Sequence, residues 1–365
     1  MTEPLSGTTI VERVFPSTPL PTRLAIALAG RVAADLGGRV VVLEPPDGDP
    51  LRRLPPFLDR GPNGERSALF QFLNASKRSC VLDERSEGQR LAAERLLAGA
   101  DAVMTDGDAA PARPRPPLTI SVTPLGWAAG GRTEAVSEFT VLALGGLLDI
   151  LGDPEREPLR LAGHQAAYAA GLAAFTALAA GLLADPAEGG GEVVDVSLLD
   201  VCHWLNWKSL SVTVDSGQPP GRLGPREEWR VVPCADGHVA VVFLERDWPA
   251  LCALVGDPEL AGAPFGKRES RARRIDELYE RVLPWFATRS RHDIYRAAQE
   301  RGVPLGPVRT IDELRADPQY VARAFLTKVR HALLGDLVVP RLPLLWDGEG
   351  FAPRPAPTLG GGGEA

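Results

Sequence analysis

The chain has 365 residues, which is enough for one large domain or two smaller ones at about 100 to 200 residues each. Its 40 Lys and Arg against 47 Asp and Glu give a net charge of -7, the wrong sign for a protein that binds nucleic acid or an anionic membrane. A hydrophobic fraction of 44% and a charged fraction of 24% exclude a disordered chain and are typical of a globular protein.

The cysteines and histidines form no recognisable cluster. The four cysteines include no Cys-x-x-Cys pair and the sequence shows no signal peptide, which predicts free thiols in a reducing compartment. The five histidines are scattered singly, without the spacing that places two imidazoles on one metal ion. We therefore expect a cytoplasmic protein that uses no metal.

The first third of the chain alternates between helical and strand-like patterns. Residues 21–36 are apolar at helical spacing, and residues 39–43 are a short apolar run typical of a buried parallel strand. Further strands are expected at residues 80–82 and 101–104, with a helix at 88–98 between them. This alternation predicts the α/β class, with a doubly wound sheet.

Residues 161–184 contain no Asp, Glu, Lys or Arg and are long enough to span a bilayer. The run is mostly Ala, Gly and Leu and includes His164 and Gln165, so its transfer into lipid is weakly favourable. We interpret it as a buried helix of a globular protein, in which small residues let another backbone approach closely. Residues 193–199 then predict a short strand that leads into the next helix.

The pattern changes after Trp229. Residues 230–244 predict a hairpin around an Asp-Gly turn, and helical stretches follow at residues 247–255, 271–286 and 293–301. A strand-like segment and a Pro/Gly-rich tail end the chain. We expect three segments: a large domain at residues 1–227, a smaller α+β domain at residues 228–328, and a segment at residues 329–365 that returns to the large domain.

Five short motifs follow one another along the chain. In order they read AADLGGRVVVLEPPDGDP, NASKRSCVLD, GEVVDVSLLD, CADGHVA and RGVPLGPV, and they begin at Ala33, Asn74, Gly191, Cys234 and Arg301. This collinear set resembles the family III CoA-transferases, which include formyl-CoA and carnitine-CoA transferases and the α-methylacyl-CoA racemases. The resemblance extends over about residues 20–359.

The resemblance implies a Rossmann-like large domain completed by the C-terminal segment, a smaller domain, and two subunits interlocked like chain links. It also implies coenzyme A and its acyl thioesters as ligands, with Glu44, Asn74, Lys77 and Arg78 in the binding site. Lys77 and Arg78 suit this ligand because charge-assisted hydrogen bonds to phosphate are strong. Without the resemblance, a solvated turn explains the Lys-Arg pair better.

The residue that carries the chemistry in the related transferases is absent. The resemblance implies an Asp near the start of the helix in residues 161–184, whose carboxylate attacks the thioester. Counting back from Gly171 places Ala167 at this position, and no Asp or Glu occurs between Glu157 and Asp185. A methyl group cannot act as the nucleophile.

Two further segments depart from the family pattern. A Pro-rich stretch at residues 105–117 replaces the usual Asn-Phe-Arg-Pro-Gly segment, so that Arg113 and Arg115 are only loose substitutes for its Arg. The sequence VFLER follows Val241, where the related transferases have a glycine-rich loop that covers the site. Both departures indicate relaxed catalytic constraint.

The racemase branch moves a proton at the carbon beside the thioester with a His and an Asp, which is a two-base task. Here Ser137 occupies the His position, with Glu138 beside it, and Ala167 again occupies the Asp position. Glu245 resembles a Glu that the racemases carry in the small domain. Two of the three expected groups are therefore missing.

His164 and Tyr168 are the only ionisable side chains in the apolar run, and they lie four residues apart on one face of a helix. We therefore take His164, Tyr168 and Glu245 as the candidate catalytic residues. The competing explanation is a His164 that is bonded to a backbone carbonyl at the start of a helix.

Two main hypotheses follow for the function. In the first, the chain is a non-catalytic subunit of a hetero-oligomeric CoA-transferase, in which a catalytic sister chain keeps the Asp. In the second, the chain is a divergent transferase or an α-methylacyl-CoA racemase-like enzyme that works as a homodimer with unorthodox groups. A CoA-binding pseudoenzyme is a third interpretation. The missing carboxylate favours the first hypothesis.

Overall fold

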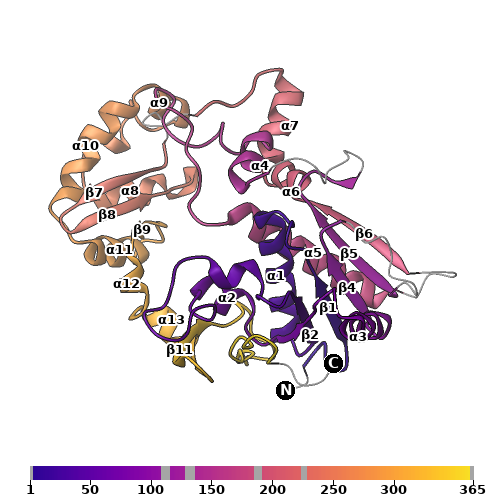
Figure 1. Ribbon diagram of the computed structural model, residues 1–365. Coiled ribbons are helices and arrows are strands. Elements are labelled where there is room, and N and C mark those ends of the chain that lie inside the picture. Colours follow the sequence, from indigo (N-terminus) through magenta and orange to yellow (C-terminus); the bar gives the residue numbers. More distant parts are fainter. Residues whose placement is uncertain (1–2, 108–115, 128–135, 185–190, 223–227, 362–365) are drawn as a thin grey trace. The chain divides into compact units, whose positions relative to one another are not determined.

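The computed structural model describes residues 3–107, 116–127, 136–184, 191–222 and 228–361 (Figure 1). The chain divides into two compact units. The large unit consists of Met1–Ile150, Leu159–Pro220 and Gln319–Ala365, and the small unit consists of Leu151–Pro158 and Gly221–Pro318.

A six-stranded, entirely parallel sheet forms the centre of the large unit (Figure 1). Its strands follow the order β3-β2-β1-β4-β5-β6, the arrangement of Rossmann-like folds. In chain order they are β1 (Thr9–Arg13), β2 (Arg39–Glu44), β3 (Arg78–Val81), β4 (Ala102–Thr105), β5 (Leu118–Thr123) and β6 (Glu192–Ser197). The α/β class and the parallel sheet are confirmed, whereas β1 and β5 were not recognised in the sequence.

Helices cover both faces of this sheet, because successive side chains of a strand point to opposite faces. Ile10 packs in one hydrophobic cluster with α1 (Leu20–Asp35) and α5 (Gln165–Leu183). Its neighbour Val11 packs in another cluster with α3 (Glu87–Ala98). These helices agree with the runs predicted at residues 21–36, 88–98 and 161–184.

Gly171 allows α5 to lie directly against α1. A Cβ atom at this position would lie 2.8 Å from the Ala25 carbonyl oxygen and 2.9 Å from Leu28 Cβ. The close approach predicted from the small residues of this run is therefore present. The buried residues of α5 are Ala166, Ala167, Ala170, Gly171, Ala174 and Leu178.

The length and composition of α5 alone would allow it to cross a membrane, and it is the only such helix among the residues that the structure describes. In this structure one face of α5 packs against α1 and the sheet. Its other face exposes apolar side chains, with Leu172 at 54% and Leu183 at 88% exposure. Only one face of α5 is therefore buried in the core of the single chain.

Shorter elements complete the large unit. They are a 3-10 turn at Pro50–Arg53, α2 (Ala68–Leu73), α4 (Glu138–Leu144), α6 (Leu198–Leu205), α7 (Trp207–Ser216), β10 (Leu326–His331) and β11 (Gly335–Pro340). The short helix α13 (Pro318–Ala322) begins at the last residue of the small unit and continues into the large unit. The β10-β11 hairpin packs against Ala75 and Leu58, and the large unit includes Gln319–Ala365, while the predicted division at residue 329 stays a prediction. The first strand of this hairpin was not recognised in the sequence.

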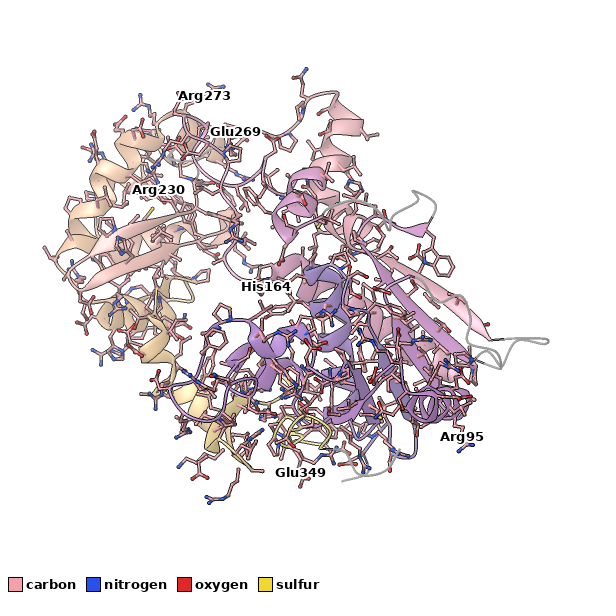
Figure 2. The ribbon with its side chains drawn as sticks, viewed as in Figure 1. Arg95, His164, Arg230, Glu269, Arg273 and Glu349 are labelled. Atoms are coloured by element: carbon pink, nitrogen blue, oxygen red, sulfur yellow. The ribbon has the colours of Figure 1, made fainter. Side chains whose placement is uncertain are left out.

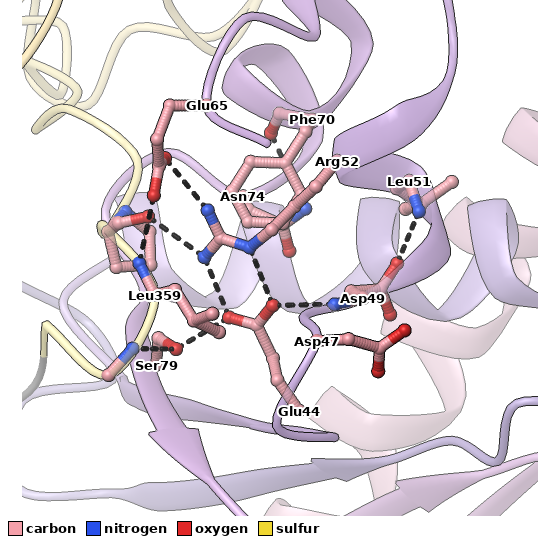
Figure 3. Close-up of polar contacts among 12 residues, drawn as sticks. Glu44, Asp47, Asp49, Leu51, Arg52, Glu65, Phe70, Asn74, Ser79 and Leu359 are labelled. Atoms are coloured by element: carbon pink, nitrogen blue, oxygen red, sulfur yellow. Dashed lines mark hydrogen bonds and ion pairs between the residues drawn. The ribbon is translucent and has the colours of Figure 1, made fainter. Parts of the chain in front are cut away.

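A buried ion network within the large unit holds Pro357 and Leu359 of the C-terminal segment (Figure 3). Arg52 donates to both oxygens of Glu44 at 2.7 Å and to Glu65 at 2.8 Å, and its guanidinium lies over the Phe70 ring. Glu65 in turn accepts the backbone N–H of Leu359 at 3.1 Å. Because paired and hydrogen-bonded charges tolerate burial, this network fixes the C-terminal segment.

The small unit is an α+β structure with its own core. Its sheet joins β7 (Arg230–Cys234), β8 (Gly237–Val241) and β9 (Gly306–Pro307), and the predicted hairpin is β7-β8. Its helices are α8 (Trp248–Val255), α9 (Arg268–Arg273), α10 (Ile275–Ala287), α11 (Arg291–Gln299) and α12 (Ile311–Leu314). The stretch predicted as one helix at residues 271–286 is thus two helices, which meet at Arg274.

Candidate active site

A carboxylate lies at the N-terminus of α5, and it comes from α4. Glu138 Oε1 accepts the backbone N–H of Ala166 at 2.7 Å and that of Ala167 at 3.3 Å. Its Oε2 lies 2.9 Å from His164 Nδ1. The Glu138 side chain is 8% exposed and that of His164 is 33% exposed. The sequence has no carboxylate at position 167, but Glu138 of the same chain places one beside it.

Two local features place Glu138 there. Ser137 and Thr140 form a capping box, which fixes the first turn of α4, where Glu138 is the first residue. The first turn of α5 contains no acidic residue, and its N-cap residue His164 makes no side-chain capping hydrogen bond. The free N–H groups and the positive end of the helix dipole attract a negative group, and Glu138 supplies it from another helix.

The side chains of His164 and Tyr168, which the sequence predicted on one face of this helix, lie close together, and their catalytic role stays a prediction. Their ring centroids are 6.0 Å apart in an edge-to-face arrangement. Burial, and to a smaller extent the charge of Glu138, raises the pKa of the Tyr168 phenol above its ordinary value. The pKa of the Cys202 thiol is raised to about 11 by the same two causes. Tyr168 and Cys202 are therefore neutral at pH 7, and Cys202 is a poor nucleophile.

Glu245, the third candidate, belongs to the small unit. Its carboxylate pairs with the guanidinium of Arg271, which is buried and also donates to Glu228 at 2.8 Å. This pairing gives Glu245 a structural contact within the small unit. Its catalytic role stays a prediction.

The predicted coenzyme-binding residues have different surroundings. The Lys77 ammonium is fully buried and lies 2.7 Å from Glu12 Oε1, and it donates to the Ala27 carbonyl at 2.8 Å and to Asn74 Oδ1 at 3.1 Å. Arg78 is exposed and lines a cavity of about 550 Å³ together with Arg354. The bonding capacity of Lys77 and Asn74 is thus used within the protein, as is that of Glu44 in the network of Figure 3.

A second cavity, of about 530 Å³, lies at the carboxyl ends of β1, β2 and β3. Arg13 and Arg85 line it, and Arg13 Nε is buried without a hydrogen-bond partner in the described part of the chain. Ligands of open parallel sheets bind at this edge, whereas Arg78 begins β3 at the opposite edge. Arg13 and Arg85 were missed in the sequence, although the rule that ligands bind where parallel strands end could have found them.

Other predicted features fall outside these sites. Arg113 and Arg115 lie outside the described residues. All four cysteines are free thiols. Within the parts of the chain that the structure covers, no three His, Cys, Asp or Glu side chains are grouped as a metal site.

Comparison with known proteins identifies the family of this fold and site. Residues 20–362 match the family described as CoA-transferase family III, and the chain belongs to this family. It is 28% identical to succinate–glutarate CoA-transferase of Agrobacterium fabrum, with 98% of this chain and 93% of that protein aligned. It is 26% identical to subunit BbsE of succinyl-CoA:(R)-benzylsuccinate CoA-transferase of Thauera aromatica, with 89% and 87% aligned.

A solved structure is also similar. The CaiB/BaiF family protein from Brucella suis superimposes with a TM-score of 0.84 at 26% identity, covering 99% of this chain and 97% of that one. The family resemblance inferred from the five motifs is confirmed.

Proposed function

We propose that this protein transfers coenzyme A between carboxylic acids, with acyl-CoA thioesters as substrates. The match to CoA-transferase family III over residues 20–362 carries the proposal. The cavity at the carboxyl ends of β1, β2 and β3 supports it, because Arg13 and Arg85 offer donors for the phosphates of coenzyme A. A cytoplasmic location remains a prediction from the cysteine pattern.

Single replacements of the cavity arginines test where coenzyme A binds. Arg13→Ala and Arg85→Ala are each expected to weaken coenzyme A binding by about 10- to 100-fold, because a charge-assisted hydrogen bond contributes about 1.5–3 kcal/mol. Isothermal titration calorimetry with coenzyme A measures the effect. Arg95→Ala, on an exposed part of α3 (Figure 2), is the charge-matched control and is expected to bind as the wild type does.

The same titration shows which of the two edges of the sheet binds coenzyme A. If Arg78→Ala weakens binding while Arg13→Ala and Arg85→Ala do not, the coenzyme occupies the cavity beside Arg78 and the proposed site is wrong. If none of these proteins binds coenzyme A, wild type included, the proposed function itself fails.

A dimer is part of this proposal, with either an identical or a sister chain as the second subunit. α7 buries none of its residues in the single chain. Trp204 of α6 is 79% exposed, and Trp207 and Val214 of α7 are 62% and 78% exposed. Apolar surface gathered in this way on neighbouring helices is typical of an interface.

Light scattering tests the assembly. We expect a particle of about twice the 39.0 kDa of the single chain, and a monomer when Trp204 and Trp207 are both replaced by Glu. A wild-type monomer that becomes a dimer only with a co-expressed sister chain would support the hetero-oligomer. A monomer under both conditions would contradict the assembly.

A further inference from the structure

We propose that Glu138 is the catalytic carboxylate that takes the acyl group from the thioester, and that the Ala166 and Ala167 N–H groups stabilise the charge which develops on it. This inference rests on the proposed function. It places the reacting group on α4, whereas the sequence motifs point to position 167 of α5.

The two carboxylate oxygens of Glu138 have different surroundings. Oε1 faces the backbone and accepts from Ala166 and Ala167. Oε2 contacts the His164 imidazole, which is one-third exposed. A rotation of that imidazole would free Oε2 for a substrate, while Oε1 would stay in place. Oε2 is therefore the attacking atom.

The proposed reaction is balanced without any further reagent. Oε2 of Glu138 forms a bond to the acyl carbon, the carbon–sulfur bond breaks, and coenzyme A leaves as the thiolate. The thiolate then attacks the Glu138 carboxyl carbon, and the first acid leaves with the Oε2 oxygen. A second acid enters by the reverse steps, leaving one of its oxygens on Glu138.

Both attacks at the Glu138 carboxyl carbon place negative charge on Oε1. The Ala166 N–H already donates to this atom at 2.7 Å, and the Ala167 N–H, at 3.3 Å, needs only a small approach to donate at the usual oxyanion distance. Each fixed donor at such an oxyanion contributes about 10²- to 10³-fold in rate. The first turn of α5 would thus act as the oxyanion hole of a covalent glutamyl intermediate.

A purely structural role, in which Glu138 only caps the N-terminus of α5, would also explain its position. Glu138→Gln separates the two roles, because the Gln carbonyl oxygen still accepts from Ala166 and Ala167 but an amide is no nucleophile. Thr140→Ser is the matched control on the same turn, because it keeps the hydroxyl of the α4 cap.

The experiment uses the full chain with succinyl-CoA and glutarate labelled with ¹⁸O in its carboxylates. Transfer is followed by chromatography of the CoA esters, and label on Glu138 by mass spectrometry of the peptide that contains it. We expect one ¹⁸O on Glu138 after turnover. In Glu138→Gln we expect transfer to fall by at least about 10³-fold, with unchanged coenzyme A affinity and melting temperature.

Three outcomes would overturn the inference and leave the proposed coenzyme A site standing. These are transfer by Glu138→Gln within a few fold of wild type, label on another residue, and a wild-type chain that binds coenzyme A without transferring it. The last result would identify the chain as a non-catalytic subunit. If the wild-type chain does not bind coenzyme A at all, the proposed function itself is wrong.

Discussion

Replacing Lys77 with Met is expected to lower the free energy of unfolding by about 3–5 kcal/mol, because it leaves the Glu12 carboxylate buried without its cation. The Lys77 and Glu12 side chains are 0% and 3% exposed, and their charged atoms lie 2.7 Å apart. Gly30 of α1 provides the space, since a Cβ there would lie 1.6 Å from Glu12 Oε1. The protein thus keeps this pair inside the layer between α1 and the sheet.

Chemical denaturation at pH 7 measures this loss. The double replacement Glu12→Gln with Lys77→Met removes both charges, so it is expected to recover much of the stability. Arg78→Met, next along the chain but exposed, is the matched control and is expected to change stability by no more than about 0.5 kcal/mol. Equal losses in the Lys77 and Arg78 variants would contradict the account.

The pH dependence of the Lys77→Met loss follows from the same burial. Burial raises the pKa of Glu12 from 4.5 to about 7 although Lys77 opposes the shift, so removal of Lys77 raises it further. A raised pKa means that the folded state binds the proton of Glu12 more tightly than the unfolded state, so the contribution of this carboxyl to stability is most favourable at low pH and is lost as the pH rises through its folded pKa. The loss is therefore expected to be smallest near pH 5 and to grow as the pH rises through 7.

The sequence predicted the elements of the large unit better than their contacts. Residues 39–43 and 101–104 are mostly apolar and short, and such runs are typical of buried parallel strands. The Lys77-Arg78 pair looked like a solvated turn, but Lys77 is buried because Glu12 neutralises it. Glu12 lies 65 positions earlier in a strand that was not recognised.

The sequence analysis noted Glu138 only as the neighbour of Ser137, and its contact with α5 was missed for the same reason. The absence of a carboxylate from residues 158–184 was read correctly from the sequence. The carboxylate that reaches α5 comes from α4, 28 residues before Ala166, and its position depends on how α4 packs against α5. The only local signal was a helix cap, Ser137 and Thr140, which marks Glu138 as the first residue of a helix.

Restoring an Asp at position 167 is expected to have opposite effects with and without Glu138. Ala167 is fully buried, and its N–H lies 3.3 Å from Glu138 Oε1. In Ala167→Asp two carboxylates would share one site, and like charges this close cannot both ionise freely. We therefore expect Ala167→Asp alone to transfer coenzyme A no faster than wild type.

In the Glu138→Gln background the same Asp faces a neutral amide, and its own carboxylate can attack the thioester. We expect Ala167→Asp to raise transfer by at least about 10-fold over Glu138→Gln alone, and Ala167→Asn, which has the same size but no charge, to give no gain. Initial transfer rates of the wild type, the two single variants and the double variant measure the coupling. A gain from Ala167→Asp while Glu138 is intact would show that position 167 lacks only its carboxylate, and that Glu138 serves α5 as a cap.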